Sequence, residues 1–426
     1  MPSRPISPQP PPEASATTAG SDLRHRVEAV GAAISSQLNQ VLGHLPRRPS
    51  GPKILANTVG INIVAASRIL KALGQLDPVA TLQMLPGPKP LLRFVLSARD
   101  QGVPEEVVDT ASDAIGAFAD LIRELTGDRS KFQAMLTMWL PEARREFEAE
   151  RRQSIYKARA ELDGVSNEFS VTSLMLRPGS KDGRNDIVVT TCMLGIDRIR
   201  PDAIVKFGTQ PVPYPDQKEP PAENIPTTLT GEPAVGGMQD IRLDQFCNAP
   251  PAPLDSQRHG DETRYWLGPT GFGPSSKVDF VASEVNRGVL EEQPVGGDRP
   301  PFFFTSADMA SRHLVFDLVV HREIYEDQAP TLFVYEASGA GFAAVGDPAR
   351  VLDIRRMSHE VEPLGSGLSR MHLTEFPRYI KLQEFIFDEL GDDPKDFRTY
   401  RVSIRYPLIG FQIALAFLGD SNGPSS

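Results

Sequence analysis

The spacing of apolar residues changes once along the chain, near Gly164, and this change predicts two kinds of structure. Apolar residues recur at helical spacing from Ser21 to Gly164, whereas beyond Gly164 short β-rich runs dominate. The sequence therefore predicts an α+β protein. An all-helical domain over residues 21–164 precedes a β-rich, antiparallel sandwich-like domain over residues 165–426.

Start and stop signals bound the expected helices. We predict helices over residues 21–45, 104–125, 142–162 and 379–390, with a compact set of shorter helices up to residue 96. Ser21 and Asp22 can cap the first helix, and Pro46 interrupts it. Gly127 lies just past the second helix, and Gly391 ends the last one. The third helix is highly charged and is interpreted as crossing the boundary between the domains.

Alternating runs in the C-terminal half predict strands over residues 171–176, 187–192, 314–325, 332–335, 400–406 and 411–417. The last two runs are joined through Pro407 and Gly410, so they predict an antiparallel hairpin that is buried on one side. Within this hairpin Arg401 and Arg405 alternate with apolar residues, which assigns them to the polar side.

Proline makes up 39 of the 426 residues, roughly double ordinary usage, and it is concentrated in two segments. Residues 1–20 hold six prolines and no apolar run, so we expect a disordered tail there. Residues 211–300 hold 14 prolines and are interpreted as long loops over or between β elements. Local order is expected around Tyr265 and Trp266.

Residues 53–73 have the pattern of a helix-turn-helix. Ala56 is small where the second helix would cross close to it, and Gly60 can adopt the left-handed conformation that a tight turn needs. Apolar side chains of the second helix would pack back onto the first: Ile61, Ala66, Ile69 and Leu70 onto Leu55 and Val59.

This motif resembles the helix-turn-helix of bacterial one-component transcription regulators such as the LacI and IclR families. The matching residues are Leu55-Ala56, Gly60-Ile61 and Ser67-Arg68-Ile69-Leu70-Lys71-Ala72-Leu73. A motif of this kind followed by a β-rich domain is also similar to uncharacterised bacterial proteins, which implies no mechanism.

The resemblance implies that the second helix enters the major groove of DNA. It implies base contacts by Asn62, Ile63, Val64 and Ser67, and phosphate contacts by Arg68 and Lys71. Two of these residues depart from the usual polar pattern. Ile63 and Val64 can contact thymine methyl groups, or they can pack against another helix or another subunit.

The formal net charge of −10 is distributed unevenly. Between Arg47 and Arg99 there are eight basic residues and one acid, Asp77, so this segment carries +7 and the rest of the chain −17. Such a segment, which includes Lys53, is typical of a nucleic-acid contact; the alternative is a solvated basic face that pairs with the acidic remainder. Arg47 and Arg48 form either an arm that reaches DNA or a plain linker.

Nothing in the sequence identifies a reaction. Pairs that have the residue types for acid–base work, such as His359 with Glu360 and His372 with Glu375, are of a kind that any chain of this length contains. We therefore expect no catalytic residue, no metal site and no cofactor.

The sequence favours a cytoplasmic location. Cys192 and Cys247 are isolated thiols, which fits a reducing compartment. Residues 1–20 lack the apolar region of a signal peptide, and no apolar run is long enough for a membrane helix.

The leading hypothesis is a DNA-binding transcriptional regulator. We expect a homodimer that associates through residues 142–162, with a β-rich domain that senses a ligand, binds a partner or mediates assembly. The alternative is a non-enzymatic structural or protein-interaction protein, in which Ile63 and Val64 are buried and Arg68 faces an acidic protein surface. An enzyme in the β-rich domain would need a cleft that gathers His313, His359, Glu360 or Asp317.

Overall fold

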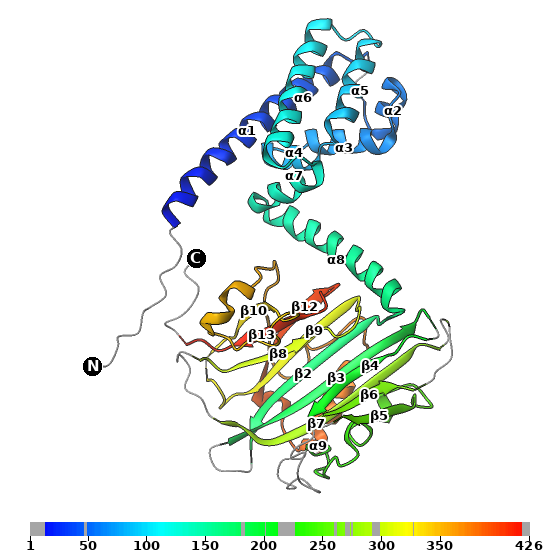
Figure 1. Ribbon diagram of the computed structural model, residues 1–426, viewed down its shortest axis with the longest axis vertical. Helices are drawn as coiled ribbons and strands as arrows, with labels where there is room; N and C mark the ends of the chain where they lie inside the picture. Colours follow the sequence, from blue (N-terminus) through cyan, green and yellow to red (C-terminus); the bar gives the residue numbers. More distant parts are fainter. Residues whose placement is uncertain are drawn as a thin grey trace, which may run out of the picture. The chain divides into compact units, whose positions relative to one another are not determined.

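The computed structural model describes residues 13–46, 49–179, 184–200, 202–211, 226–259, 262–268, 273, 276–291, 299–326 and 328–419. The chain divides into two compact units, residues 1–148 and 149–426. A helical region is followed by a strand-rich region, which confirms the α+β prediction (Figure 1). Each unit has its own apolar core.

The described part of the helical unit contains α1 (Glu13–His44), α2 (Pro52–Val59), α3 (Ile63–Leu73), α4 (Pro78–Met84), α5 (Pro88–Arg99), α6 (Glu105–Leu125), α7 (Arg129–Leu136) and the 3₁₀ turn η1 (Thr137–Trp139). Helix α8 (Pro141–Asp163) crosses the division between the units, as predicted. Residues 13–20, predicted as part of a disordered tail, form the first turns of α1. They follow the last proline of the tail and include three alanines, which favour helix. Residues 1–12 lie outside the described residues.

A single apolar cluster joins the helices of this unit. Its fully buried members include Leu38, Ile69, Phe94 and Phe118. Gly31 lets α1 approach α4 closely, because a Cβ atom at this position would lie 2.3 Å from the carbonyl oxygen of Pro78. Among the described residues no single helix is long and apolar enough to cross a membrane; the bent pair α2 and α3 qualifies by length and composition alone.

The described strands of the second unit are β1 (Val165–Ser166), β2 (Phe169–Pro178), β3 (Arg184–Arg198), β4 (Lys206–Pro211), β5 (Leu254–His259), β6 (Glu262–Leu267), β7 (Val278–Glu291), β8 (Phe302–Ser306), β9 (His313–His321), β10 (Thr331–Glu336), β11 (Glu362–Ser366), β12 (Phe397–Arg405) and β13 (Phe411–Ala416). The shorter helical elements are η3 (Gly237–Gln239), η4 (Asp244–Phe246), η6 (Pro348–Asp353), α9 (Tyr379–Leu390) and η7 (Pro394–Asp396). Helix α9 has the predicted bounds and ends at Gly391 in the left-handed conformation.

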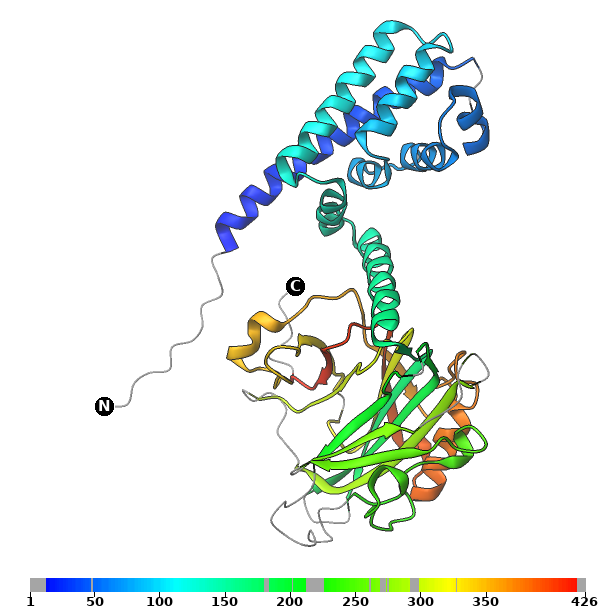
Figure 2. The ribbon, with the colours of Figure 1, turned by 45° about the vertical axis from the view of Figure 1, so that its right-hand side comes forward.

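The described strands form one seven-stranded sheet and two three-stranded sheets. The large sheet has the order β1-β3-β2-β9-β12-β11, with β7 also paired to β3. Strands β2 and β9 are parallel, and the other pairs of this sheet are antiparallel. Apolar residues of β8 and β13 pack on one of its faces, whereas α9 packs on the other (Figure 2). This layered arrangement confirms the sandwich-like prediction.

The predicted hairpin over residues 400–417 is wrong. Strand β12 pairs with β9 and β11, whereas β13 pairs with β8 and β10. The connection between them carries positive φ angles at Tyr406 (53°) and Gly410 (82°), and it redirects the chain into the second sheet. The alternation pattern identified two strands correctly but could not identify their partners.

The Pro-rich stretch contains more regular structure than predicted. Strands β5 and β6 pair with each other around Tyr265 and Trp266, where local order was expected. Strand β7, at Val278–Glu291, was missed although it pairs with β3 over most of its length. Residues 212–225 and 292–298, which hold several of the prolines, lie outside the described residues.

Candidate functional site

Helices α2 and α3 have the geometry of a helix-turn-helix. Their axes bend by 119° at the three-residue break, within the range typical of this motif. Gly60 adopts the predicted left-handed conformation, with φ 65° and ψ 33°. The backbone N–H of Ile61 donates to the carbonyl oxygen of Ala56 at 3.1 Å, which closes the turn. Leu55 and Val59 belong to the same apolar cluster as the buried residues of α3, which confirms the predicted packing of the two helices.

Helix α3 has one buried face and one exposed face. Ala66, Ile69 and Ala72 are buried. The opposite face carries Ile63, Val64, Ser67 and Lys71; the first two side chains are 51% and 64% exposed, Ser67 is half-buried and Lys71 is exposed. The alternative hypothesis required buried Ile63 and Val64, and within this chain they are exposed.

Asn62 has a structural role that was not predicted from the sequence. It is the N-cap of α3, and its Oδ1 accepts a hydrogen bond from the backbone N–H of Val64 at 2.7 Å. Such a cap satisfies one of the free N–H groups at the start of a helix. The side chain is exposed, so it holds the start of α3 while lying at the surface.

Arg68 does not extend outward as a phosphate contact would. Its Nε donates to the carbonyl oxygen of Met84 at 3.2 Å, and its Nη2 donates to that of Leu85 at 3.1 Å. These carbonyls end α4, where helix geometry leaves acceptors without partners. Arg68 was predicted to contact phosphate, but it caps the end of α4 instead. The sequence could not show this, because the acceptors belong to another helix.

Arg129, at the start of α7, caps the same helix end. Its Nη2 donates to the carbonyl oxygens of residues 82, 83 and 85 at 2.8, 3.1 and 2.8 Å. Burial, and secondarily the nearby Arg68, lowers the pKa of Arg129 to about 10. The two guanidinium groups thus hold α3, α4 and α7 together.

Helix α5 brings further cations to the exposed start of α3. A hollow of about 210 Å³ is lined by Ile61, Asn62, Ala65, Lys89, Pro90 and Arg93. A shallower hollow of about 480 Å³ continues along α5 past Leu92 and Leu96 to Arg99. In the sequence Lys89 and Arg93 are identified only as part of the +7 charge of this segment, because no local pattern places them beside Asn62.

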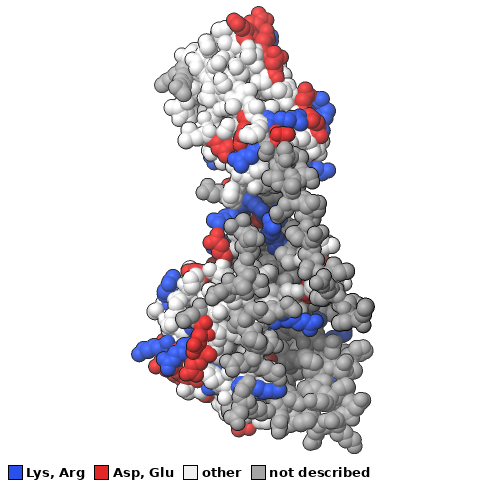
Figure 3. All heavy atoms as spheres, turned by 90° about the vertical axis from the view of Figure 1, so that its left-hand side faces the viewer, with Lys and Arg blue, Asp and Glu red and all other residues white. Residues whose placement is uncertain are grey.

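Five cations of this segment are exposed: Lys53, Lys71, Lys89, Arg93 and Arg99. The one acid among residues 49–99, Asp77, caps α4 through the backbone N–H of Val79. We define the α3–α5 surface as the exposed face of α3 together with Lys53, Lys89, Arg93 and Arg99. Figure 3 shows a different face of the helical unit, where acidic and basic atoms are interspersed around a broad uncharged area. Arg47 and Arg48, also predicted to contact DNA, lie outside the described residues.

The β-rich unit contains a polar pocket of about 630 Å³ at one end of the large sheet. Its lining includes the basic residues Lys277, Arg312, Arg378 and Arg405 and the acidic residues Glu168, Asp279 and Glu375. His313, the first residue of β9, also lines it. We call this hollow the His313 pocket.

His313 is held by two side chains. Its Nδ1 lies 3.2 Å from Glu375 Oε1, and its Nε2 lies 2.7 Å from Ser403 Oγ. The ring of Phe169 meets the imidazole edge-on at 5.0 Å between centroids. Burial lowers the pKa of His313 despite the raising effect of Glu375, and Arg405 and Arg401 lower it further. The imidazole is therefore neutral near pH 7. Sequence proximity suggested that Glu375 pairs with His372, whereas the fold pairs it with His313.

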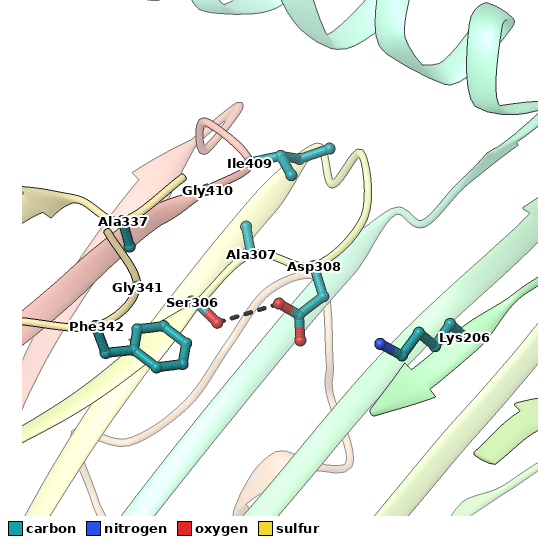
Figure 4. Close-up of a pocket in the computed structure, with 9 residues that line it drawn as sticks. All are labelled: Lys206, Ser306, Ala307, Asp308, Ala337, Gly341, Phe342, Ile409 and Gly410. Atoms are coloured by element: carbon teal, nitrogen blue, oxygen red, sulfur yellow. Dashed lines mark hydrogen bonds between the residues drawn. The ribbon is translucent and has the colours of Figure 1, made fainter. Parts of the chain in front are cut away.

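A second hollow, of about 570 Å³, lies beside the ends of β4 and β8 (Figure 4). Ser306 Oγ donates to Asp308 Oδ1 at 3.2 Å, and the ammonium group of Lys206 points toward the same carboxylate. Phe342 closes one side with its ring against Phe304, 4.7 Å between centroids. This arrangement suits a small polar ligand, but it shows no nucleophile–base pair.

The remaining candidate groups do not gather in one cleft. Asp317 is fully buried, bonded to Arg401 and Tyr379. His359 lies 3.0 Å from an Arg152 nitrogen. Among the described residues, no group of three or more His, Cys, Asp or Glu side chains could hold a metal ion.

Comparisons of this chain with protein-family models, with curated proteins and with solved structures find no match.

Proposed function

We propose that the protein is a DNA-binding transcriptional regulator whose helical unit contacts duplex DNA through the α3–α5 surface. The observation that carries this proposal is the helix-turn-helix itself, bent by 119°, with the outer face of α3 exposed and Lys89 and Arg93 of α5 beside the start of α3. An exposed helix of this kind fits the major groove, and clustered cations neutralise phosphates.

The geometry revises which residues would make the contacts. Lys53, Lys71, Lys89 and Arg93 are exposed and take the phosphate role, whereas Arg68 is occupied at the end of α4. Ile63, Val64 and Ser67 face outward at the start of α3, where residues of a recognition helix meet base edges. Apolar side chains there favour contact with thymine methyl groups.

The second half of α8 supports the proposed homodimer. Within the β-rich unit it is anchored on one side, where Gln153 Nε2 donates to the Tyr406 hydroxyl at 3.1 Å and the ring of Tyr156 packs on that of Tyr406. Ile155 and Leu162, seven residues apart, are exposed. Two such helices can associate through these residues, and a symmetric dimer carries two α3 helices. We place the regulator in the cytoplasm, which agrees with its two free buried thiols.

A protein-interaction role is the second candidate. It is favoured by Ile63, Val64, Leu92 and Leu96, exposed apolar residues on α3 and α5 that a protein partner would cover. The β-rich unit then has the sensing, partner-binding or assembly role in either case.

The test is binding of the full-length protein to a fluorescent mixed-sequence duplex between 50 and 200 mM salt. We expect log Kd to depend linearly on log salt. The variant K89A/R93A should bind more weakly, with a slope smaller by about 0.9 for each phosphate that it no longer neutralises. The control R123A/K131A removes the same charge from α6 and α7 and should bind as wild type does. Absence of binding at 50 mM salt, or equal weakening in the control, contradicts the proposal.

A further inference from the structure

The three side chains at the edge of the His313 pocket form a continuous hydrogen-bonded chain. Ser403 Oγ lies 2.7 Å from His313 Nε2, and Glu375 Oε1 lies 3.2 Å from His313 Nδ1. With neutral imidazole, both contacts are satisfied when Nδ1–H donates to Glu375 and Nε2 accepts from the Ser403 hydroxyl. These are the same atom-by-atom roles that a serine, a histidine and a carboxylate have in serine hydrolases.

The fold explains why these residues meet. Strands β9 and β12 are antiparallel, with Val315 opposite Ser403 and His313 opposite Arg405. His313 is therefore the diagonal neighbour of Ser403 on one face of the sheet, within reach of a long side chain. Glu375 comes from the segment that leads into α9 and lines the same pocket. Three segments far apart in sequence thus supply the hydroxyl, the imidazole and the carboxylate.

The electrostatics suit a base rather than a fixed cation. Burial lowers the pKa of His313, so the imidazole can accept a proton at neutral pH. Burial raises the pKa of Glu375, but a backbone hydrogen bond, His313 and Arg405 together lower it below its usual value. The carboxylate therefore stays ionised and can stabilise the imidazolium that forms after proton transfer.

We propose that Ser403 is a nucleophile activated by His313, with Glu375 as the positioning residue, and that the site hydrolyses small esters. Ser403 Oγ attacks the acyl carbon while its proton passes to His313 Nε2. The bond from this carbon to the leaving oxygen breaks, and His313 gives the proton to that oxygen. A water molecule then attacks the acyl–serine by the same route, which releases a carboxylic acid and restores Ser403.

The surroundings of Ser403 fit a small polar substrate. Ser403 is exposed at the surface of β12, so an acyl group can reach it, and the adjoining pocket of about 630 Å³ can hold such a group. Arg405 lies two residues along the strand on the same face and is 74% exposed, 4.0 Å from Glu375. In this proposal its positive charge stabilises the negative oxygen of the tetrahedral intermediate. This activity is independent of DNA binding by the helical unit.

The test is labelling of the full-length protein with a fluorophosphonate reagent, followed by peptide mass mapping. The reagent bonds to an activated serine and releases fluoride. We expect the label on Ser403, with loss of labelling in S403A and at least a 100-fold slower rate in H313A, because a positioned general base contributes about 10²–10⁴-fold. Hydrolysis of p-nitrophenyl acetate should fall in parallel.

Control variants separate this role from a structural one. S256A removes an exposed serine of β5 and should leave both rates unchanged. In E375Q the loss of the carboxylate should slow labelling about tenfold or more. The midpoint of the pH profile of labelling should also move to lower pH, because Glu375 raises the pKa of His313 whereas Arg405 and Arg401 lower it. Thermal melting checks that each variant is folded. Labelling of Ser403 no faster than that of Ser256 in the folded wild type overturns the proposal, as does an unchanged rate in H313A.

Discussion

The two candidate sites of this protein are built in opposite ways. The α3–α5 surface is open, and its cations Lys71, Lys89 and Arg93 extend into solvent. The His313 pocket is concave, and its central imidazole is held by Glu375 and Ser403. In the roles that we propose, the first site binds a large charged polymer through many weak, salt-dependent contacts, whereas the second positions one small molecule against one reactive group.

This difference determines what each site contributes to stability. Exposed cations that interact mainly with solvent add little to the free energy of folding. Their number and positions can therefore suit a binding partner without loss of stability. Buried polar groups must be paired, and each pair fixes the packing around it. In the helical unit the same contrast separates Arg68 and Arg129, which cap α4, from the exposed cations around them.

The largest effect is expected at the buried Asp317–Arg401 pair beneath α9. Arg401 donates to both carboxylate oxygens of Asp317 at 2.7 Å, and the Tyr379 hydroxyl donates to the same carboxylate at 2.7 Å. R401A leaves a fully buried charge without its partner, so the free energy of unfolding should fall by about 3–5 kcal/mol. Urea denaturation of the full-length protein measures it.

The matched control is the ion pair between Arg322 and Asp396, in which the Arg322 side chain is 69% exposed. R322A should lower the free energy of unfolding by less than about 1 kcal/mol. Equal losses in the two variants would contradict the contrast between buried and exposed charges.

An intermediate effect is expected for R129A in the helical unit. The substitution removes the hydrogen bonds to three carbonyl oxygens at the end of α4, and bonds to a charged group are worth about 1.5–3 kcal/mol each, although their effects do not add. We expect a loss of about 2 kcal/mol or more in the unfolding of this unit. K89A/R93A should change it by less than about 0.5 kcal/mol. A stability loss in K89A/R93A as large as that in R129A would assign a structural role to the α5 cations.

The smallest effect is the pH dependence from His313. Its pKa is lowered in the folded state relative to about 6.5 in the unfolded chain, so unfolding takes up a proton between these two values. The stabilisation by neutral His313 is therefore complete above about pH 6.5 and is lost as the pH falls through the folded pKa. Urea denaturation at pH 8 and at pH 5 should show a larger loss for wild type than for H313Q. A difference of the opposite sign would mean that the folded protein favours the imidazolium.

Local features of the fold were predictable from the sequence, and non-local ones were not. The turn at Gly60, the buried face of α3 and the end of α9 at Gly391 depend on neighbours within a few residues. The partners of β12 and β13 depend on strands distant in sequence, and alternation alone carries no information about them. The sequence pattern assigned Arg401 to the polar side of its strand. Its partner in the structure, Asp317, lies 84 residues away, and no local pattern identifies such a partner.

The candidate sites also combine local features, which the sequence predicts, with non-local ones, which it does not. The +7 segment signalled a surface rich in cations, whereas the sequence left open whether Ile63 and Val64 are exposed or packed against another helix. The capping role of Arg68 could not be inferred, because its acceptors belong to another helix. The contact of His313 with Ser403 depends on the register of β9 against β12, which no local pattern specifies.

The most direct test of DNA binding by the α3–α5 surface is photocrosslinking. The photoreactive residue p-benzoylphenylalanine is placed at Val64, exposed on α3, and in a second protein at Thr110, exposed on α6. Both proteins are irradiated in the full-length form with a duplex at 50 mM salt. We predict a crosslink to DNA from position 64 and none from position 110. Crosslinking from position 110 alone, or from neither position while the duplex is bound, would contradict the assignment of this surface.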